Sequence, residues 1–290
     1  MNELRILAMG DNHGNADTIE RVLNETQGEE YDYVIHTGDL TNACIDGMDE
    51  GSAQLEQLVP LLDELDDRGS LVYLWGNRDY QSGFIGVGQR VDRYADIELD
   101  IGTQLPQSGS VEIDGQKFTS HPDEVDANTI LVTHYEHSEL FDHFECRCYL
   151  SGHVHLGRIK NKSLNTGFLF RDDSHGAEPL EGGYFEVILS EDDMDVEFHS
   201  FGGLRQGSCS DHSTLGTQFV PANWRTSCKF CYDSDEFYQQ IIDSAKYQLD
   251  MHGNPITEDS VIETATDLVD ESGVPSDFEV QLGEYVDTLV

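Results

Sequence analysis

The first two-thirds of the chain alternate short apolar runs with segments whose apolar residues recur every three or four positions. The runs predict β-strands, and the periodic segments predict helices. The expected strands cover 4–9, 33–35, 71–75, 110–113, 117–119, 129–133 and 149–150, and the expected helices cover 16–23 and 55–65. After Gly157 only strands are expected, at 167–170, 184–189 and 196–201. This order predicts a layered α/β sandwich.

The last third of the chain has a different pattern. Residues 203–232 are rich in Gly, Ser, Cys and Thr and show no apolar periodicity. Beyond them, amphipathic segments predict helices over 237–249, 261–269 and 276–289, separated by Gly and Pro. We therefore expect one domain in residues 1–202 and a C-terminal appendage in 203–290. The appendage would consist of a turn-rich segment (203–232) and a helical segment (233–290).

The composition is that of a folded protein with an unusual charge. Hydrophobic residues make up 38% of the 290 residues, which is enough to bury a core. The chain carries 57 acidic and 16 basic residues, a formal net charge of −41. An acidic, lysine-poor surface resembles that of proteins from extreme halophiles, in which salt screens the charge. The alternative is an acidic surface that receives a basic partner.

Several classes of protein are disfavoured by the same composition. No apolar run reaches the ~18 residues of a membrane span, and the N-terminal run lacks the basic start and cleavage site of a signal peptide. Six cysteines in 290 residues do not make a disulfide scaffold. We expect a cytoplasmic protein with no membrane partner. The charge argues against a basic nucleic-acid groove, although nucleic acid stays open as a partner in high salt.

Five short polar blocks each follow an apolar run. They are Asp11-Asn12-His13, Gly38-Asp39, Gly76-Asn77-Arg78-Asp79, His134 and Gly152-His153-Val154-His155. The carboxyl ends of neighbouring strands in an α/β sheet converge on one crevice, so we expect these blocks to meet. One such block is common in a solvated turn, but five in order at strand ends indicate a metal site. The glycines before Asp39, Asn77 and His153 are expected to allow sharp turns.

The ordered set D-x-H, G-D, G-N-x-D, H and G-H-x-H resembles the calcineurin-like metallophosphoesterase superfamily. The Asp11-Asn12-His13-Gly14 start resembles its small bacterial and archaeal phosphodiesterase branch. The resemblance covers roughly residues 1–202 and implies a four-layer αββα sandwich with two divalent cations. It implies that Asp11, His13, Asp39 and His155 bind one cation, and that Asp39, as a bridge, binds the other with Asn77, His134 and His153.

The resemblance also implies the reaction. Two cations about 4 Å apart would clamp a phosphoryl group and activate a bridging hydroxide that attacks phosphorus. No nucleophilic side chain is needed, and Asp39, Asn77, Arg78 and Asp79 form the expected catalytic set. Manganese is the expected metal, and Fe, Zn, Ni or Co also suit these ligands. Cyclic nucleotides, nucleotide diesters, nucleic-acid ends and phosphorylated metabolites all remain open as phosphate-ester substrates.

Arg78 departs from the family pattern, in which many members carry G-N-H-[DE] with a proton-donating His. Arginine stays protonated near neutral pH, but it can hold a phosphate oxygen with two hydrogen bonds. This departure favours phosphodiester hydrolysis, with Asp79 orienting Asn77 or Arg78. Phosphomonoesterase or phosphoprotein phosphatase activity is the alternative, and a non-catalytic protein-binding scaffold is another. The alternative for Arg78 itself is a surface ion pair with Asp79 or Asp92.

Other histidines carry weaker signals. His36 lies inside an expected strand, so we interpret it as a packed residue or one that supports the metal ligands. His121 and His137 flank the His134 strand, and either could act as a substitute proton donor. Cys146 and Cys148 are expected to be small core residues.

A second metal site is predicted in the appendage. Cys209 and His212 form one pair of potential ligands, and Cys228 and Cys231 form another, with the spacing of a structural zinc site. The alternative is unpaired cysteines in a loop with a chance histidine. The amphipathic helices beyond could pack on the sandwich, on each other or on a protein partner.

Overall fold

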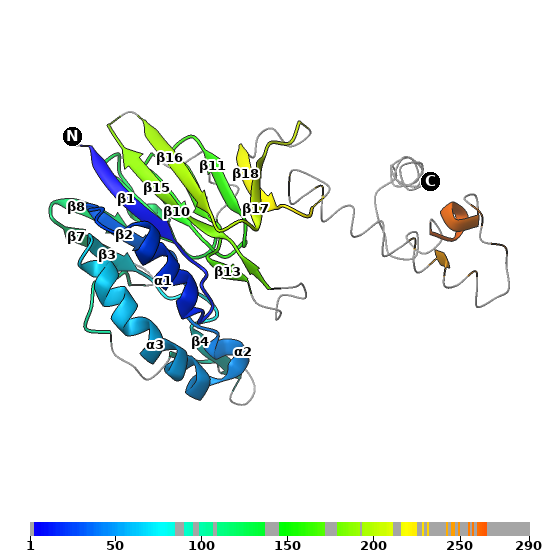
Figure 1. Cartoon of the computed structure of the whole chain (residues 1–290), viewed down its shortest axis with the longest axis horizontal. Helices are drawn as coiled ribbons and strands as arrows, with labels where there is room; N and C mark the ends of the chain where they lie inside the picture. The colour runs from blue at the N-terminus through cyan, green and yellow to red at the C-terminus, as the bar shows by residue number, and fades with distance from the viewer. Residues whose placement is uncertain are drawn as a thin grey trace. The chain divides into compact units, whose positions relative to one another are not determined.

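The computed structural model describes most of the chain up to residue 224 and selected residues beyond it. The described residues are 3–84, 90–94, 99–106, 109–136, 145–171, 179–191, 193–210 and 216–224, then Cys228, Cys231, Ile242, Ala245, Lys246, Leu249, Pro255, Thr257 and 260–265. The chain divides into two compact units, Met1–Asn223 and Trp224–Val290. Figure 1 shows the two sheets and the helices of the first unit.

A six-stranded sheet in the first unit has the order β16-β15-β1-β2-β3-β6. Its strands are β1 (Leu4–Met9), β2 (Tyr33–His36), β3 (Ser70–Tyr73), β6 (Thr103–Gln104), β15 (Gly183–Leu189) and β16 (Met194–Ser200). The first four are parallel, whereas β15 and β16 are antiparallel to their neighbours. Helix α1 (Ala16–Glu25) connects β1 to β2, and α2 (Ala43–Asp46) and α3 (Met48–Asp66) connect β2 to β3 (Figure 1).

An eight-stranded sheet has the order β17-β18-β11-β12-β10-β9-β8-β7. Its strands are β7 (Ser110–Ile113), β8 (Gln116–Thr119), β9 (Thr129–Thr133), β10 (Cys148–Ser151), β11 (Gly157–Lys160), β12 (Ser163–Thr166), β17 (Leu204–Gly207) and β18 (Thr217–Pro221). Two small hairpins complete the strands, β4 (Tyr80–Phe84) with β5 (Arg90–Tyr94) and β13 (Phe170–Arg171) with β14 (Leu180–Glu181). The short 3-10 helix η1 (Pro122–Glu124) precedes β9.

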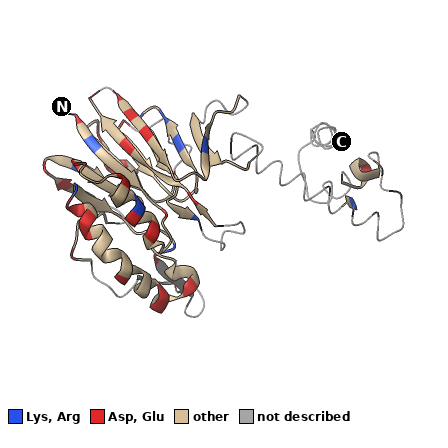
Figure 2. Cartoon of the chain, viewed as in Figure 1, with Lys and Arg blue, Asp and Glu red and all other residues tan. Residues whose placement is uncertain are grey.

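Acidic residues are distributed over the helices and strands of the first unit, and basic residues are few (Figure 2). Several of the basic side chains form ion pairs. Arg5 pairs with Glu29 at 2.7 Å and with Glu186 at 2.8 Å, and Arg21 pairs with Glu25 at 2.9 Å. Because the chain has 57 acidic and only 16 basic residues, such pairs can neutralise only a minority of its carboxylates.

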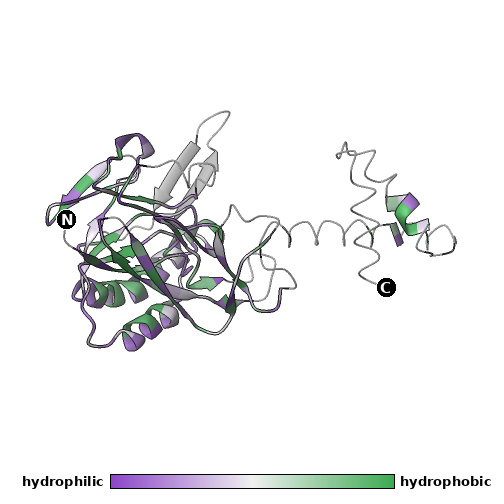
Figure 3. Ribbon diagram, turned by 90° about the horizontal axis from the view of Figure 1, so that it is seen from above, coloured by the Kyte–Doolittle hydropathy of each residue, from purple (hydrophilic) through white to green (hydrophobic). Residues whose placement is uncertain are grey.

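Two apolar layers hold the first unit together. Ile6 and Ala8 of β1 face a core between the sheets that includes Phe118 of β8. Leu7 of β1 faces the opposite way, into a core shared with Ile19 of α1 and residues of α3. Both faces of β1 are therefore buried, one by the second sheet and the other by helices. Figure 3 shows hydrophobic residues on the strands and helices of this unit. The layered α/β sandwich predicted from the apolar pattern is confirmed.

The eight-stranded sheet continues past residue 202, where the sequence placed a domain boundary. Strands β17 and β18 pair with each other, and β18 pairs with β11. Phe219 of β18 joins the core between the sheets. The strand Thr217–Pro221 has a short apolar run among polar neighbours, so its sequence carries no periodic signal. The part of the segment 203–232 expected to be turn-rich thus contributes two strands to the sheet.

Only parts of the second unit are described. Residues 260–265 are helical, inside the expected helix 261–269. Ile242, Ala245 and Leu249, from the apolar face of the first expected helix, are buried. The expected helix 276–289 lies outside the described residues. In the part of the chain that the structure describes, no helix has the length and apolar character that a membrane crossing requires.

Candidate metal centre

The polar blocks at the strand ends lie together at one edge of the sandwich. Main-chain hydrogen bonds connect the loops that carry them. The N–H of Asp11 donates to the carbonyl of Gly38 at 2.9 Å, and the N–H of His13 donates to that of Asp39 at 3.0 Å. From the second sheet, the N–H of His153 donates to the Asp11 carboxylate at 3.1 Å. The loops after β1, β2 and β10 therefore form one hydrogen-bonded unit across both sheets.

Two groups of potential metal ligands share one carboxylate. In each group all potential ligand atoms lie within 4.8 Å of one another. The first group is Asp11, His13, Asp39 and His155, and the second is Asp39, His134 and His153. Asn77 joins the second group because its Oδ1 atom lies 2.8 Å from His134 Nε2. The structure thus brings together every residue that the sequence singled out for the two cations.

The orientation of the His134 ring shows that the second group fits a cation. Its Nδ1 atom donates to the carbonyl of Thr37 at 2.9 Å, which places the other nitrogen, Nε2, toward the site. Nε2 lies 2.8 Å from Asn77 Oδ1 and 3.4 Å from Asp39 Oδ2, and both of these atoms are acceptors. Three lone-pair atoms that converge on one point suit a bound cation.

The first group converges in the same way. His13 Nδ1 lies 3.1 Å from Asn42 Oδ1, which orients the ring so that Nε2 faces the site. His13 Nε2 lies 3.0 Å from His155 Nε2, and His155 Nε2 lies 3.6 Å from Asp11 Oδ1. Imidazole and carboxylate donors of this kind are ligands of divalent metal ions.

The charges of the buried groups also favour a bound cation at this site. Asp11 and Asp39 are both buried, and burial raises the pKa of Asp11 well above its ordinary value. Burial would also raise the pKa of Asp39, but the neighbouring His134 and His13 together lower it. Burial opposes charge on His134, yet Asp39 raises its pKa to about 9. Without a metal ion, a proton on His134 therefore supplies positive charge beside the buried carboxylates.

Backbone geometry at the site is unusual for residues with side chains. Five of the predicted ligands have positive φ: Asp11 (56°), His13 (48°), Asp39 (54°), His153 (71°) and His155 (51°). Such conformations cost about 1–3 kcal/mol each and persist where surrounding contacts enforce them. They turn the chain sharply enough for both members of the Asp11–His13 pair, and of the His153–His155 pair, to reach the site.

The glycines of the polar blocks serve two different purposes. Gly38 has a φ of +100°, so it makes the sharp turn that the sequence predicted. Gly76 and Gly152 are needed for space instead. A Cβ atom on Gly76 would lie 2.1 Å from Asp39 Oδ1, and one on Gly152 would lie 2.6 Å from Asp11 Oδ2. These two glycines let the backbone of one loop approach the carboxylate of another.

His36 connects the loops that carry two of the predicted ligands. Its Nδ1 atom accepts a hydrogen bond from the N–H of Gly38 at 3.2 Å, so its Nε2 atom donates to Asn12 Oδ1 at 3.0 Å. The Asn12 amide in turn donates to the carbonyl of Leu40 at 3.1 Å. Burial lowers the pKa of His36 to about 3, which keeps the ring neutral. This buried chain of hydrogen bonds joins the two loops that carry Asp11 and Asp39.

Asp79 and Arg78 connect the loops after β2 and β3. The Asp79 carboxylate accepts from the main-chain N–H of Thr41 at 2.6 Å and from that of Gly76 at 2.7 Å. Burial, reinforced by Asp39, raises its pKa to about 7. The N–H of Arg78 donates to Asp39 Oδ1 at 2.7 Å. Asp79 therefore holds the main chain on both sides of the site, and its expected role in orienting Asn77 or Arg78 stays a prediction.

Sequence reasoning missed several residues at the site. Asn165 of β12 is buried, and its amide donates to the carbonyl of Gly152 at 2.9 Å and to Glu136 at 2.8 Å. Glu136 also forms an ion pair with Arg158 of β11. Tyr135 packs against two of the predicted ligands. The Asn165–Thr166–Gly167 block follows a single apolar residue, Leu164, and no apolar run, so the rule that found the other blocks does not find it.

His121, one of the two candidate substitute proton donors, has a structural role. His121 accepts a hydrogen bond from the N–H of Asp123 at 3.2 Å and caps η1. His137 lies outside the described residues. Cys148 is fully buried, as the sequence predicted for a core residue, and burial raises the pKa of the Cys146 thiol to about 11.

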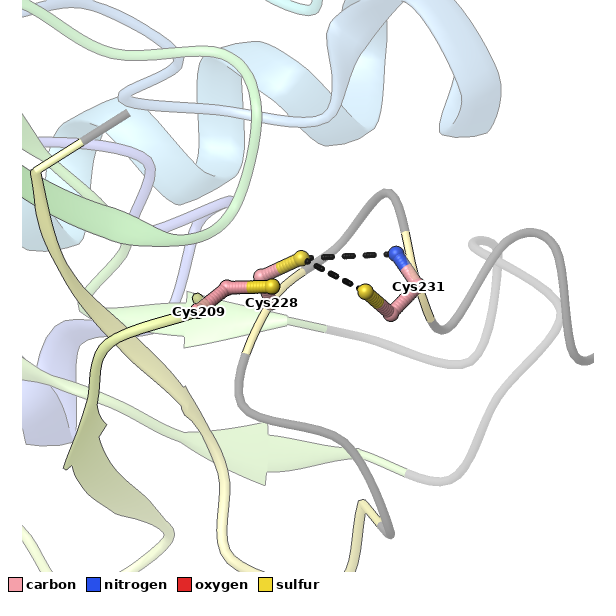
Figure 4. A group of neighbouring side chains, drawn as sticks. All are labelled: Cys209, Cys228 and Cys231. Carbon is pink, nitrogen blue, oxygen red and sulfur yellow. Dashed lines mark hydrogen bonds between the residues drawn. The ribbon is translucent and has the colours of Figure 1, made fainter. Parts of the chain in front are cut away.

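Two cysteines of the predicted zinc site, Cys228 and Cys231, lie side by side in the second unit (Figure 4). Cys209, from the other predicted pair, belongs to the first unit. Cys228 Sγ lies 3.3 Å from Cys231 Sγ and accepts from the N–H of Cys231 at 3.4 Å. Thiolates grouped in this way are common zinc ligands. The fourth predicted ligand, His212, lies outside the described residues.

The family of the chain follows from a match to a family model. The model of the calcineurin-like phosphoesterases matches residues 4–157, which is more than half of the chain and includes every predicted ligand of the two cations. The chain belongs to this family, and the resemblance drawn from the polar blocks is confirmed. Family membership implies a metal-dependent hydrolase of phosphate esters.

Solved structures of similar proteins include small phosphoesterases. A novel archaeal phosphodiesterase is 18% identical, covering 68% of this chain and 100% of its own, with a TM-score of 0.37. YfcE, a phosphoesterase from E. coli, is 15% identical, covering 69% and 100%, with a TM-score of 0.38. A metallophosphoesterase from Sphaerobacter thermophilus is 17% identical, covering 91% and 99%, with a TM-score of 0.33. No curated protein matches the chain.

Proposed function

We propose that this protein hydrolyses a phosphodiester with the help of two divalent cations. The observation that carries the proposal is the pair of ligand groups that share Asp39. Asp11, His13, Asp39 and His155 would hold one cation, and Asp39, Asn77, His134 and His153 would hold the other. Manganese is the cation that we expect first, with Fe, Zn, Ni or Co as alternatives.

Bound cations would supply positive charge to the phosphoryl group and lower the pKa of a nearby water. The residues of the chain set the geometry for this chemistry. Asp39 is fixed at Oδ1 by the N–H of Arg78, with Oδ2 on the side of His134. The left-handed conformations at Asp11 and His13 direct both side chains into the site. Because the nucleophile comes from water, the proposal needs no reactive side chain.

Arg78 supports a preference for diesters. It lies on the loop after β3, and its own N–H bonds to the shared carboxylate of Asp39. A guanidinium group carries five N–H donors, so it can hold a phosphate oxygen, but it does not release a proton near neutral pH. A poor alkyl leaving group needs a proton, whereas an activated leaving group does not. Activated diesters should therefore react faster than alkyl monoesters.

The test is a substrate panel at high salt with Mn, Ni, Co, Zn and Mg supplied separately. We expect bis(p-nitrophenyl) phosphate to be hydrolysed much faster than alkyl monoesters. Arg78→Ala should weaken activity, and Arg78→His should raise monoester turnover relative to diester turnover because histidine can donate a proton. Equal wild-type rates on both classes would contradict the diester preference. A protein that binds none of these metals would contradict the two-cation site.

We also propose a structural zinc ion on Cys209, Cys228 and Cys231, with His212 as the fourth ligand predicted from spacing. The distance of 3.3 Å between the Cys228 and Cys231 sulfur atoms supports it. The double variant Cys228→Ser with Cys231→Ser should release about one zinc per chain by metal analysis and keep most activity on a small diester. Cys44→Ser, at an exposed cysteine, is the matched control. Full zinc content in the double variant would contradict this site.

A further inference from the structure

Tyr135 is an exposed aromatic residue in direct contact with the candidate metal centre. Half of its surface (50%) is accessible to solvent. Its ring centroid lies 4.5 Å from that of His153 and 5.2 Å from that of His134, with the rings at 61° and 70°. A single exposed aromatic residue is common on a protein surface. This one packs against two predicted ligands of the same cation, so one imidazole ring separates it from the expected phosphoryl position.

The surrounding structure holds Tyr135 in place. Its carbonyl accepts from the hydroxyl of Thr133 at 2.7 Å and from the hydroxyl of Tyr149 at 3.3 Å. Both donors are buried, Thr133 at 6% exposure and Tyr149 at 0%. The His134 ring beside it is fixed by its bond to Thr37. These bonds fix the main chain at Tyr135, and the two imidazole contacts limit the positions of its ring, so the ring loses little conformational entropy when a ligand packs on it.

We propose that Tyr135 is a stacking platform for an aromatic ester group of the substrate, and that this group is a nucleobase. The proposal rests on the proposed function, because the cations would hold the phosphoryl group next to the ring. Stacking of a base on an aromatic side chain is a contact that every nucleobase can make, since each has a flat π-face.

The charge of the protein adds a physical reason for such a contact. With a net charge of −41, the surface repels an anionic phosphate ester at low salt and does not attract one at high salt, where the charge is screened. A nucleobase is neutral at pH 7, so its stacking energy involves no such repulsion and is little changed by salt. An aromatic platform therefore supplies affinity that the surface charge cannot supply.

The test measures equilibrium binding to the full-length, manganese-loaded protein, so that it does not depend on turnover. The ligands are adenosine 5′-monophosphate, ribose 5-phosphate and inorganic phosphate, titrated by calorimetry in molar KCl. We expect the nucleotide to bind about tenfold or more tightly than ribose 5-phosphate. Tyr135→Ala should abolish this preference, whereas Tyr135→Phe, which keeps the ring, should retain it. Inorganic phosphate should bind equally to all three proteins.

Other outcomes separate the two proposals. Phosphate binding with no preference for the nucleotide in the wild type would overturn the stacking platform and leave the metal centre standing. A preference that survives in Tyr135→Ala would assign the base to another surface. Failure of all three ligands to bind the metal-loaded protein would contradict the proposed function and the platform with it. Tyr135→Leu, which is apolar but not aromatic, should behave like Tyr135→Ala if stacking is the cause.

Discussion

The two ligand groups of the centre differ in charge and in how they are supported. The first group combines the two buried carboxylates of Asp11 and Asp39 with two imidazoles. The second has only the shared Asp39 carboxylate, with imidazoles and the amide of Asn77. A dication in the first group would face two negative charges, and one in the second would share a single negative charge. Because ligand charge sets affinity for hard cations, we expect the first site to bind more tightly.

The largest expected effect comes from removing the shared carboxylate. Asp39→Asn keeps the size of the side chain and an oxygen for the Arg78 N–H, but it removes the only charge common to both groups. We expect both cations to be lost and kcat/KM on an activated diester to fall by about 10³ or more. Metal analysis and steady-state assays give the two readouts.

The control for this variant is Asp123→Asn, since the Asp123 side chain is 92% exposed and should leave metal content and turnover unchanged. An Asp39→Asn protein that keeps wild-type turnover with metal bound would show that the carboxylate is not shared in the way proposed.

A smaller effect distinguishes the two sites from each other. His153→Ala removes a ligand of the second group alone, so the protein should retain one tightly bound manganese ion per chain. Asp11→Asn removes half of the charge of the first group, so the affinity of the tighter site should drop by about tenfold or more. Metal titration by calorimetry measures both. If His153→Ala abolished the tight site and Asp11→Asn affected only the weak one, the assigned order of affinities would be reversed.

A third effect, on stability, is expected from removing the hydrogen bonds of His36, which connect the loops that carry Asp11 and Asp39. His36→Phe leaves the Asn12 amide and the Gly38 N–H without their partner, both inside the protein. We expect the free energy of unfolding of the metal-free protein to fall by about 1–3 kcal/mol, measured in denaturant. Asp123→Asn, at a side chain that is 92% exposed, is the control and should change stability little. Unchanged stability in His36→Phe would contradict a supporting role for this ring.

The smallest effect on the centre is expected from salt. The two sites are buried, whereas most of the 57 acidic side chains lie outside them, so salt should screen the surface more than the centre. The Debye length falls from ~8 Å at 0.15 M to ~3 Å at 1 M salt. We expect Tm to rise between dilute buffer and molar KCl while manganese affinity changes little. A Tm that does not rise would contradict the interpretation of the acidic surface as an adaptation to high salt.

The sequence predicted best what depends on neighbours in the chain. Local apolar patterns, each visible within about ten residues, predicted the strands β1, β2 and β9 and the helices α1 and α3. The polar blocks after these strands are equally local, so the predicted ligands could be named before their distances were known. Strand β12 shows the limit of this approach. Its sequence, Ser-Leu-Asn-Thr, is mostly polar but fully buried, because Asn165 and Thr166 bond to the carbonyls of Gly152 and Ser151.

By itself the sequence determined the family and the layered fold and named the candidate metal ligands, because those signals lie in short runs and in their order. Tertiary structure alone decided how the residues act on one another. It placed the loop of Gly76 so close to Asp39 that no side chain fits between them. It set the Tyr135 ring against His153 and His134. Such contacts join residues that lie on different strands and loops. The distance between two strands is set only when the sheets pack, so a pattern along the chain does not give it.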